Sequence, residues 1–303
     1  MPELRNSMQR HLFRHAAVRA VYAATALLVA LPGAAWAARV GVVSNNYVNE
    51  TTADFNARIP GHTFTAVDVS VTVPTAATLA ANFDVLLVFE DTTFVNATAV
   101  GNTVAAYANT GRAVVIGTFY DQDRSDGPPS FTPHGWGALE GIDPNTTDGT
   151  GTSYSPRSLD ASSIVAHPLT AGVSTLFAQK FAGGNQPKPA SIVVANWAQK
   201  NAKGNPDPAI AYRITGSACV MHIAIAPNYP TIGTPNVDFG GDYYRAWRNA
   251  FDFGAGHCVT GTNNIQAVAA VSIPAVSPAA LALTALLLAA LGAAALPRAR
   301  RRS

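Results

Sequence analysis

The chain has 303 residues, of which 48% are hydrophobic, and its formal net charge is +2. Eight of its 20 basic residues, but only one of its 18 acidic residues, lie within 1–37 and 273–303. The segment between these ends therefore carries 12 basic and 17 acidic residues, a net charge of −5. An acidic segment without stripes of lysine and arginine is unsuited to anionic polymers, so we expect no nucleic-acid partner.

The first 37 residues have the three parts of a secretory signal peptide. Four arginines precede an apolar stretch from Ala20 to Leu31, and Ala35-Trp36-Ala37 has the small-x-small pattern of a cleavage site. The apolar stretch is short for a membrane span, which makes an uncleaved anchor the weaker alternative. We therefore expect export, with cleavage after Ala37.

The segment at 38–260 alternates hydrophobic runs with helical patterns and is long enough for one sizeable domain. Strands are predicted at 39–43, 62–71, 84–89 and 113–117, separated by helices at 52–59, 75–82 and 95–109. The run at 84–89 is continuously hydrophobic, as expected of a strand buried on both faces of a parallel sheet. This βαβαβαβ order predicts an α/β fold with a doubly wound, mostly parallel sheet.

The composition changes between Asp121 and Ser158, where Gly, Pro, Asp, Ser and Thr are frequent. We expect a long excursion over the carboxyl edge of the sheet. Strand patterns return at 191–197, 209–214 and 219–226, and residues 243–253 predict a helix. Tyr243, Tyr244, Trp247 and Phe251 have the spacing of a packing face on that helix. Residues 261–272 are predicted to be a linker.

Cys219 and Cys258 are the only cysteines. In an exported protein, two cysteines without metal-ligand spacing favour one disulfide bond. It would close a loop of about 40 residues and contribute about 3–4 kcal/mol on the chain-entropy model.

The last 31 residues combine a short motif, an apolar run and a basic end. The run at 279–296 has 18 residues without a charge, which as a helix is about 27 Å long and just spans a membrane. Four arginines follow it, as expected at the cytoplasmic end of a transmembrane helix. The cytoplasmic membrane is therefore an expected partner.

The order of Ile273-Pro274-Ala275-Val276-Ser277-Pro278, apolar helix and arginine cluster resembles the C-terminal sorting signals read by exosortase-type membrane proteases. The most similar group is named for an Ile-Pro-Thr-Leu motif. Ile273, Pro274 and Ser277 fit that motif, whereas Ala275 and Val276 replace its Thr and Leu. The resemblance implies an exosortase-type partner and cleavage near the motif. Retention of 273–303 as a membrane anchor is the alternative.

The body resembles the class I glutamine amidotransferase-like, flavodoxin-like superfamily, and within it the trehalose-utilisation-type proteins. The resemblance rests on residues 83–88 and 107–117, and on His167-Pro168-Leu169-Thr170-Ala171-Gly172. It implies a nucleophilic cysteine after the fourth strand, where this chain reads Gly117-Thr118-Phe119-Tyr120. Glutamine hydrolysis by that route is thus excluded, and Thr118 without an identified base is expected to be structural.

Five carboxylates follow the third and fourth strands, at the edge where doubly wound folds bind ligands: Glu90, Asp91, Asp121, Asp123 and Asp126. They could coordinate a divalent cation or act as an acid/base pair on a sugar, with ordinary solvated loops and helix caps as the simpler interpretation. His134 and Trp136 fit either sugar stacking or loop packing. His167 is expected to cap a turn, with catalysis as the alternative, and His222 to be a core histidine. We expect no metal and no other cofactor.

Two functions follow from these patterns. The first is a non-catalytic surface module that binds an extracellular glycan or another envelope component through the excursion at 121–158. The second is an extracellular carbohydrate-active hydrolase whose weak catalytic candidates are Glu90, Asp121, Asp123, His134 and His167. Convergence of Glu90, Asp121, Asp123 and His134 around one cleft, with two carboxyl groups about 5–10 Å apart, would favour the hydrolase, and scatter would exclude it.

Overall fold

The computed structural model describes residues 37–92, 94, 96–128 and 134–258. The predicted signal peptide apart from Ala37, the linker, the sorting motif and the helix at 279–296 lie outside these ranges. Within them, no helix combines the length and the apolar character needed to cross a membrane.

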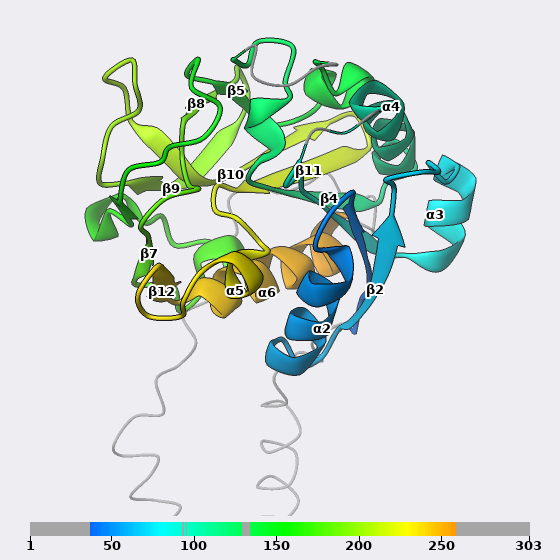
Figure 1. The fold of residues 1–303 in the computed structure, drawn as a ribbon, viewed down its shortest axis with the longest axis horizontal. Coiled ribbons are helices and arrows are strands. Elements are labelled where there is room, and N and C mark those ends of the chain that lie inside the picture. The colour runs from blue at the N-terminus through cyan, green and yellow to red at the C-terminus, as the bar shows by residue number, and fades with distance from the viewer. Residues whose placement is uncertain (1–36, 93, 95, 129–133, 259–303) are drawn as a thin grey trace, which may run out of the picture. The chain divides into compact units, whose positions relative to one another are not determined.

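A seven-stranded sheet forms the centre of the domain (Figure 1). Its strands, in spatial order, are β2 (Thr63–Asp68), β1 (Arg39–Ser44), β3 (Val85–Val88), β4 (Ala113–Gly117), β11 (Ala218–Ile223), β10 (Asp207–Thr215) and β9 (Ile192–Trp197). The five strands from β2 to β11 are mutually parallel. β10 is antiparallel to both of its neighbours. The fold is therefore α/β with a large, mostly parallel central sheet.

Helices cover both faces of this sheet. α3 (Ala76–Asn82) and α4 (Ala97–Ala108) pack with Leu86, Val114 and Val220 in one hydrophobic core. α2 (Val48–Arg58) and α6 (Tyr243–Phe253) meet on the other face, where Phe55 contacts Trp247 and Phe251. Tyr243, Trp247 and Phe251 are fully buried and Tyr244 is half-buried, which confirms three of the four residues of the predicted packing face.

Several predicted boundaries shift by a few residues. α2 begins at Val48 instead of Thr52, after a left-handed Tyr47 that provides no capping side chain. β2 ends at Asp68 instead of Val71, because the Asp68 carboxylate accepts a hydrogen bond from the Ser70 amide and turns the chain. These starts and ends depend on local turns that hydrophobic periodicity does not encode.

The excursion and the segment after it contain short elements that the sequence did not predict. β5 (Asn145–Thr147) pairs with β8 (Asn185–Pro187), and β6 (Arg157–Ser158), β7 (Leu176–Ala178) and β12 (Phe239–Gly241) form a second small sheet. The remaining short helices are η1 (Tyr120–Gln122), η2 (Gly137–Gly141), η3 (Ala161–Ser163), η4 (Pro168–Thr170), α5 (Tyr229–Ile232) and η5 (Gly254–Cys258). Strands of two or three residues are too short to show a period.

Candidate functional site

The carboxyl ends of β3 and β4 bring the predicted carboxylates to one edge of the sheet. The Phe119 amide donates a hydrogen bond to the Glu90 carbonyl at 3.1 Å, which ties the two strand ends together. Asp91 contacts the Asn228 amide, and burial raises the pKa of Asp91 to about 6. Glu90 and Asp91 thus lie at the carboxyl edge of the sheet, next to the turn that follows β4.

Three candidate residues converge there, and we call Glu90, Asp123 and His134 the acidic cluster. Nδ1 of His134 lies 3.8 Å from Oδ1 of Asp123, and both carboxyl side chains are almost completely buried. Burial, followed by the charge of Asp123, raises the pKa of Glu90 to about 10. Burial, followed by the charge of Glu140, raises the pKa of Asp123 to about 7. At neutral pH Glu90 therefore holds a proton.

Asp121 points away from this cluster into a separate polar chain. Its Oδ2 lies 3.5 Å from Nε2 of His222, and His222 Nδ1 lies 2.9 Å from Nδ2 of Asn145. With the Asn185 amide oriented to donate, its nitrogen lies 2.7 Å from Oδ2 of Asp121. His222 thus lies in the core, as predicted, with Nδ1 paired to Asn145 and Nε2 facing Asp121, and Asp121 does not join the acidic cluster.

Three further candidates have structural roles. His167 caps η4 by accepting a hydrogen bond from the Leu169 amide at 3.1 Å, and its ring stacks on Tyr212. Trp136 is fully buried and stacks on Tyr120. Its ring therefore packs within the loop and presents no face to a sugar. Thr118 is fully buried as well. The predictions that His167 caps a turn and that Trp136 packs in the loop are therefore confirmed.

Asp126 and its neighbours form an ion network behind the edge. Arg124 contacts Asp126 and Asp143, and Asp143 also contacts Lys188. Burial raises the pKa of Asp143, although both cations oppose that shift. Within the described ranges, no three His, Cys, Asp or Glu side chains are arranged to hold a metal ion.

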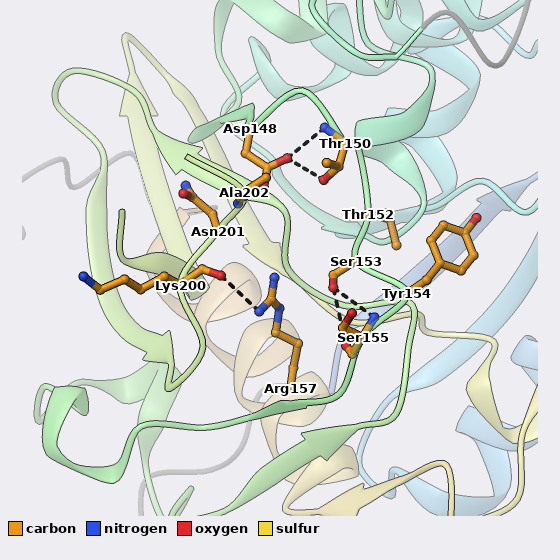
Figure 2. A pocket seen from close by; sticks show the side chains of 10 residues that line it. All are labelled: Asp148, Thr150, Thr152, Ser153, Tyr154, Ser155, Arg157, Lys200, Asn201 and Ala202. Atoms are coloured by element: carbon orange, nitrogen blue, oxygen red, sulfur yellow. Dashed lines mark hydrogen bonds between the residues drawn. The ribbon is translucent and has the colours of Figure 1, made fainter. Parts of the chain in front are cut away.

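A pocket of about 440 Å³ lies beside the edge, and we call it the polar pocket (Figure 2). It is lined by Asp148, Thr150, Thr152, Ser153, Tyr154, Ser155, Arg157, Lys200, Asn201 and Ala202. Residues 148–157 belong to the predicted excursion, whereas 200–202 follow β9 and carried no signal in the sequence. Gln122 donates a hydrogen bond to the Tyr154 hydroxyl at 2.9 Å, which joins the pocket wall to the turn that contains Asp121 and Asp123.

The charges in the polar pocket are largely compensated. Nη2 of Arg157 lies 3.2 Å from Oδ2 of Asp207. The Asp207 carboxylate also accepts hydrogen bonds from the backbone amides of Gly184 and Asn185. Burial raises the pKa of Asp207 only to about 6, so this carboxylate is ionised at neutral pH. Asp148 accepts hydrogen bonds from Thr150 and Ala202. Figure 2 shows the Lys200 side chain extending away from the other lining residues.

Cys219 lies buried in β11. The side chain of its predicted partner, Cys258, lies outside the described part of the chain. The disulfide bond therefore stays a prediction.

Comparison with known proteins gives only remote structural likeness. No family model and no curated protein matches the sequence. A solved structure described as a novel carbohydrate deacetylase aligns at 12% identity and a TM-score of 0.41, covering 72% of this chain and 33% of that one. The chain thus spans about a third of that protein's length. The strand order of the present chain defines it as an α/β domain with a mostly parallel central sheet.

Proposed function

We propose that this chain is an exported, surface-displayed protein whose α/β domain binds a neutral glycan in the polar pocket. The observation that carries this proposal is the chemistry of the lining. Hydroxyl groups of Thr150, Ser153 and Ser155 and the amide of Asn201 surround an Arg157 that Asp207 neutralises. Sugar hydroxyls both donate and accept hydrogen bonds, so they match hydroxyl and amide side chains without needing a net charge.

Tyr154 supplies an apolar surface at the same pocket. Its side chain is 63% exposed, and its ring makes an edge contact with Phe181 at 5.4 Å between centroids. A tyrosine fixed at its hydroxyl by Gln122 and at its edge by Phe181 presents a stable ring face. Such a face suits the C–H groups of a pyranose, while neighbouring polar groups set its orientation.

Display at the cell surface is supported by the two ends of the sequence. The signal-peptide pattern implies export, and the motif at 273–278 with its apolar run and arginines implies sorting by an exosortase-type protease. A protein that only binds glycan at the cell surface needs no catalytic residues.

The test is binding to an array of neutral and acidic oligosaccharides. We expect the protein to retain neutral oligosaccharides, and Tyr154→Ala to weaken binding about 5- to 30-fold, since loss of one ring contact costs about 1–2 kcal/mol. Ile192→Ala is the matched control, because Ile192 is 47% exposed and lies outside the polar pocket. Failure to bind any glycan, or equal binding by both variants, would reject the proposal.

Hydrolysis of the glycan is a second candidate, favoured by the convergence of Glu90, Asp123 and His134. Glu90 would act as the general acid and Asp123 as the base that activates water. Both side chains are almost completely buried, and neither lines the polar pocket. Binding without cleavage is therefore the better-supported function. If the wild type released reducing ends from a bound oligosaccharide and Glu90→Gln abolished that release, hydrolysis would become the better-supported function.

A further inference from the structure

The first residues of the domain meet a buried histidine and a carboxylate. The Ala38 backbone nitrogen donates a hydrogen bond to Nδ1 of His62 at 3.3 Å. Nε2 of the same ring lies 3.2 Å from Oδ1 of Asp252 on α6. Because Nδ1 accepts, the ring proton of a neutral His62 is on Nε2, facing the carboxylate. Ala38, His62 and Asp252 thus form one polar chain from the start of β1 to α6.

The histidine at the centre of this polar chain is protected from water, whereas the Asp252 side chain is 35% exposed. The His62 side chain is 1% exposed, and its ring packs edge-on against Phe64 and Phe251. Ala38 is 2% exposed, whereas Ala37 is exposed. Residues 38 and 62 immediately precede the paired strands β1 and β2, whose register fixes their separation. The geometry around the Ala38 nitrogen is therefore set by the sheet.

The predicted cleavage site coincides with this arrangement. Hydrolysis of the Ala37–Ala38 peptide bond consumes one water, leaves a carboxylate on Ala37 and creates an α-ammonium group on Ala38. The nitrogen that donates one N–H to His62 as an amide then carries three N–H groups and a positive charge. Asp252 can balance that charge through the imidazole.

We propose that the His62–Asp252 pair is the binding site for the α-amino group created by cleavage after Ala37, so that the fold is stabilised by its own maturation. The hydrogen bond changes from a neutral to a charge-assisted one, which is roughly twice as strong. Other charged groups near this end are Asp84, which accepts from the Arg39 amide at 2.9 Å, the Arg39 guanidinium, and Arg248, which lies 3.5 Å from Oδ2 of Asp252. The proposal does not depend on what the polar pocket binds.

The pH dependence follows from the sign of this contact. An α-amino group has an ordinary pKa of about 7.7–8.0, and a partner that favours its charged form raises that pKa in the folded state. The added stability is therefore present near neutral pH, where the neutral His62 ring accepts at Nδ1, and is lost as pH rises through the folded-state value of the α-amino group.

The experiment uses the mature chain, residues 38–303, purified in detergent after cleavage of the full-length protein. Its melting temperature is compared with that of the same protein selectively acetylated on the α-amino group, which removes the charge without restoring the leader. At pH 6.5 we expect the free amine to melt about 2–4 °C higher, and at pH 9.5 we expect the difference to vanish.

Two variants separate this contact from a general effect of the charge. Both His62→Gln and Asp252→Asn should abolish the difference between free and acetylated protein at pH 6.5, whatever they do to the melting temperature itself. His134→Gln, in the acidic cluster, should leave the difference intact. Equal melting temperatures of free and acetylated wild-type protein, or a difference that survives both variants, would overturn the proposal.

Discussion

Nε2 of His222 lies 3.5 Å from Oδ2 of Asp121, and both side chains are sealed from solvent. His222 belongs to β11 and Asp121 follows β4, so this contact joins two neighbouring strands of the main sheet. Asn145 on β5 and Asn185 on β8 bind the two ends of the same pair. The small β5–β8 ladder is therefore attached to the main sheet through four polar side chains, which fixes the wall beside the polar pocket.

Asp121→Asn and Asp121→Ala should separate the shape of this residue from its charge. Burial raises the pKa of Asp121 well above its ordinary value, so a neutral amide resembles its protonated form. We expect Asp121→Asn to cost less than about 1 kcal/mol and Asp121→Ala to cost about 2–4 kcal/mol, because alanine leaves Nε2 of His222 and the side-chain amide of Asn185 facing no acceptor. Urea unfolding at pH 7 measures both. Equal losses in the two variants would show that Asp121 acts through its charge.

Glu90 should make the domain less stable as pH rises. Its folded pKa of about 10 lies above the ordinary 4.5, so the stability it confers is complete below about pH 4.5 and declines as pH rises toward 10. Glu90→Gln removes this dependence and should gain about 2 kcal/mol over wild type at pH 8, with little difference at pH 4. Thermal unfolding across this range tests it. A wild type that becomes more stable than Glu90→Gln at pH 8 would contradict the buried protonated state.

The sequence predicted the parallel half of the fold better than the site. Continuous hydrophobic runs such as Val85–Val88 specify buried strands, and the loops that follow them place Glu90 and Asp123 at one edge. Hydrophobic patterning could not distinguish Asp121 from Asp123. The two residues are only two positions apart, yet Asp121 faces His222 on β11 and Asp123 faces His134. The contribution of residues 200–202 to the polar pocket was missed, because the pocket lies between two loops that are distant in the sequence.

Gly101 is predicted to be essential for the packing of α4. A Cβ atom at this position would lie 1.8 Å from the Trp136 carbonyl oxygen, which is backbone and cannot turn away. Gly101→Ala should therefore destabilise the domain by about 3 kcal/mol or more, despite the better helix propensity of alanine. Gly141→Ala is the matched control, because no atom lies within 4 Å of its added methyl group. Urea unfolding that gives similar losses for both would refute this packing argument.

Cys219 and Cys258 should form one disulfide bond in the exported protein. Peptide mapping without reduction should recover a linked pair, and replacement of Cys258 by serine should cost about 3–4 kcal/mol by releasing a loop of about 40 residues in the unfolded state. Protein retained in the reducing cytoplasm serves as the control and should carry two thiols. Free thiols at both positions in exported protein would disprove the bond.

Processing at both ends is the last prediction, because it determines which molecule reaches the surface. Mass spectrometry of surface-released protein should show an N-terminus at Ala38 and no residues beyond about Ile273. Charged residues at 35 and 37 should block the first cleavage, since the peptidase site accepts only small side chains there. Pro274→Ala should impair the second cleavage while leaving the first unchanged, because Pro274 is one of the three residues that fit the sorting motif. A tail that stays intact in every fraction, with the N-terminus correctly cleaved, would mean that residues 279–296 serve as a permanent anchor.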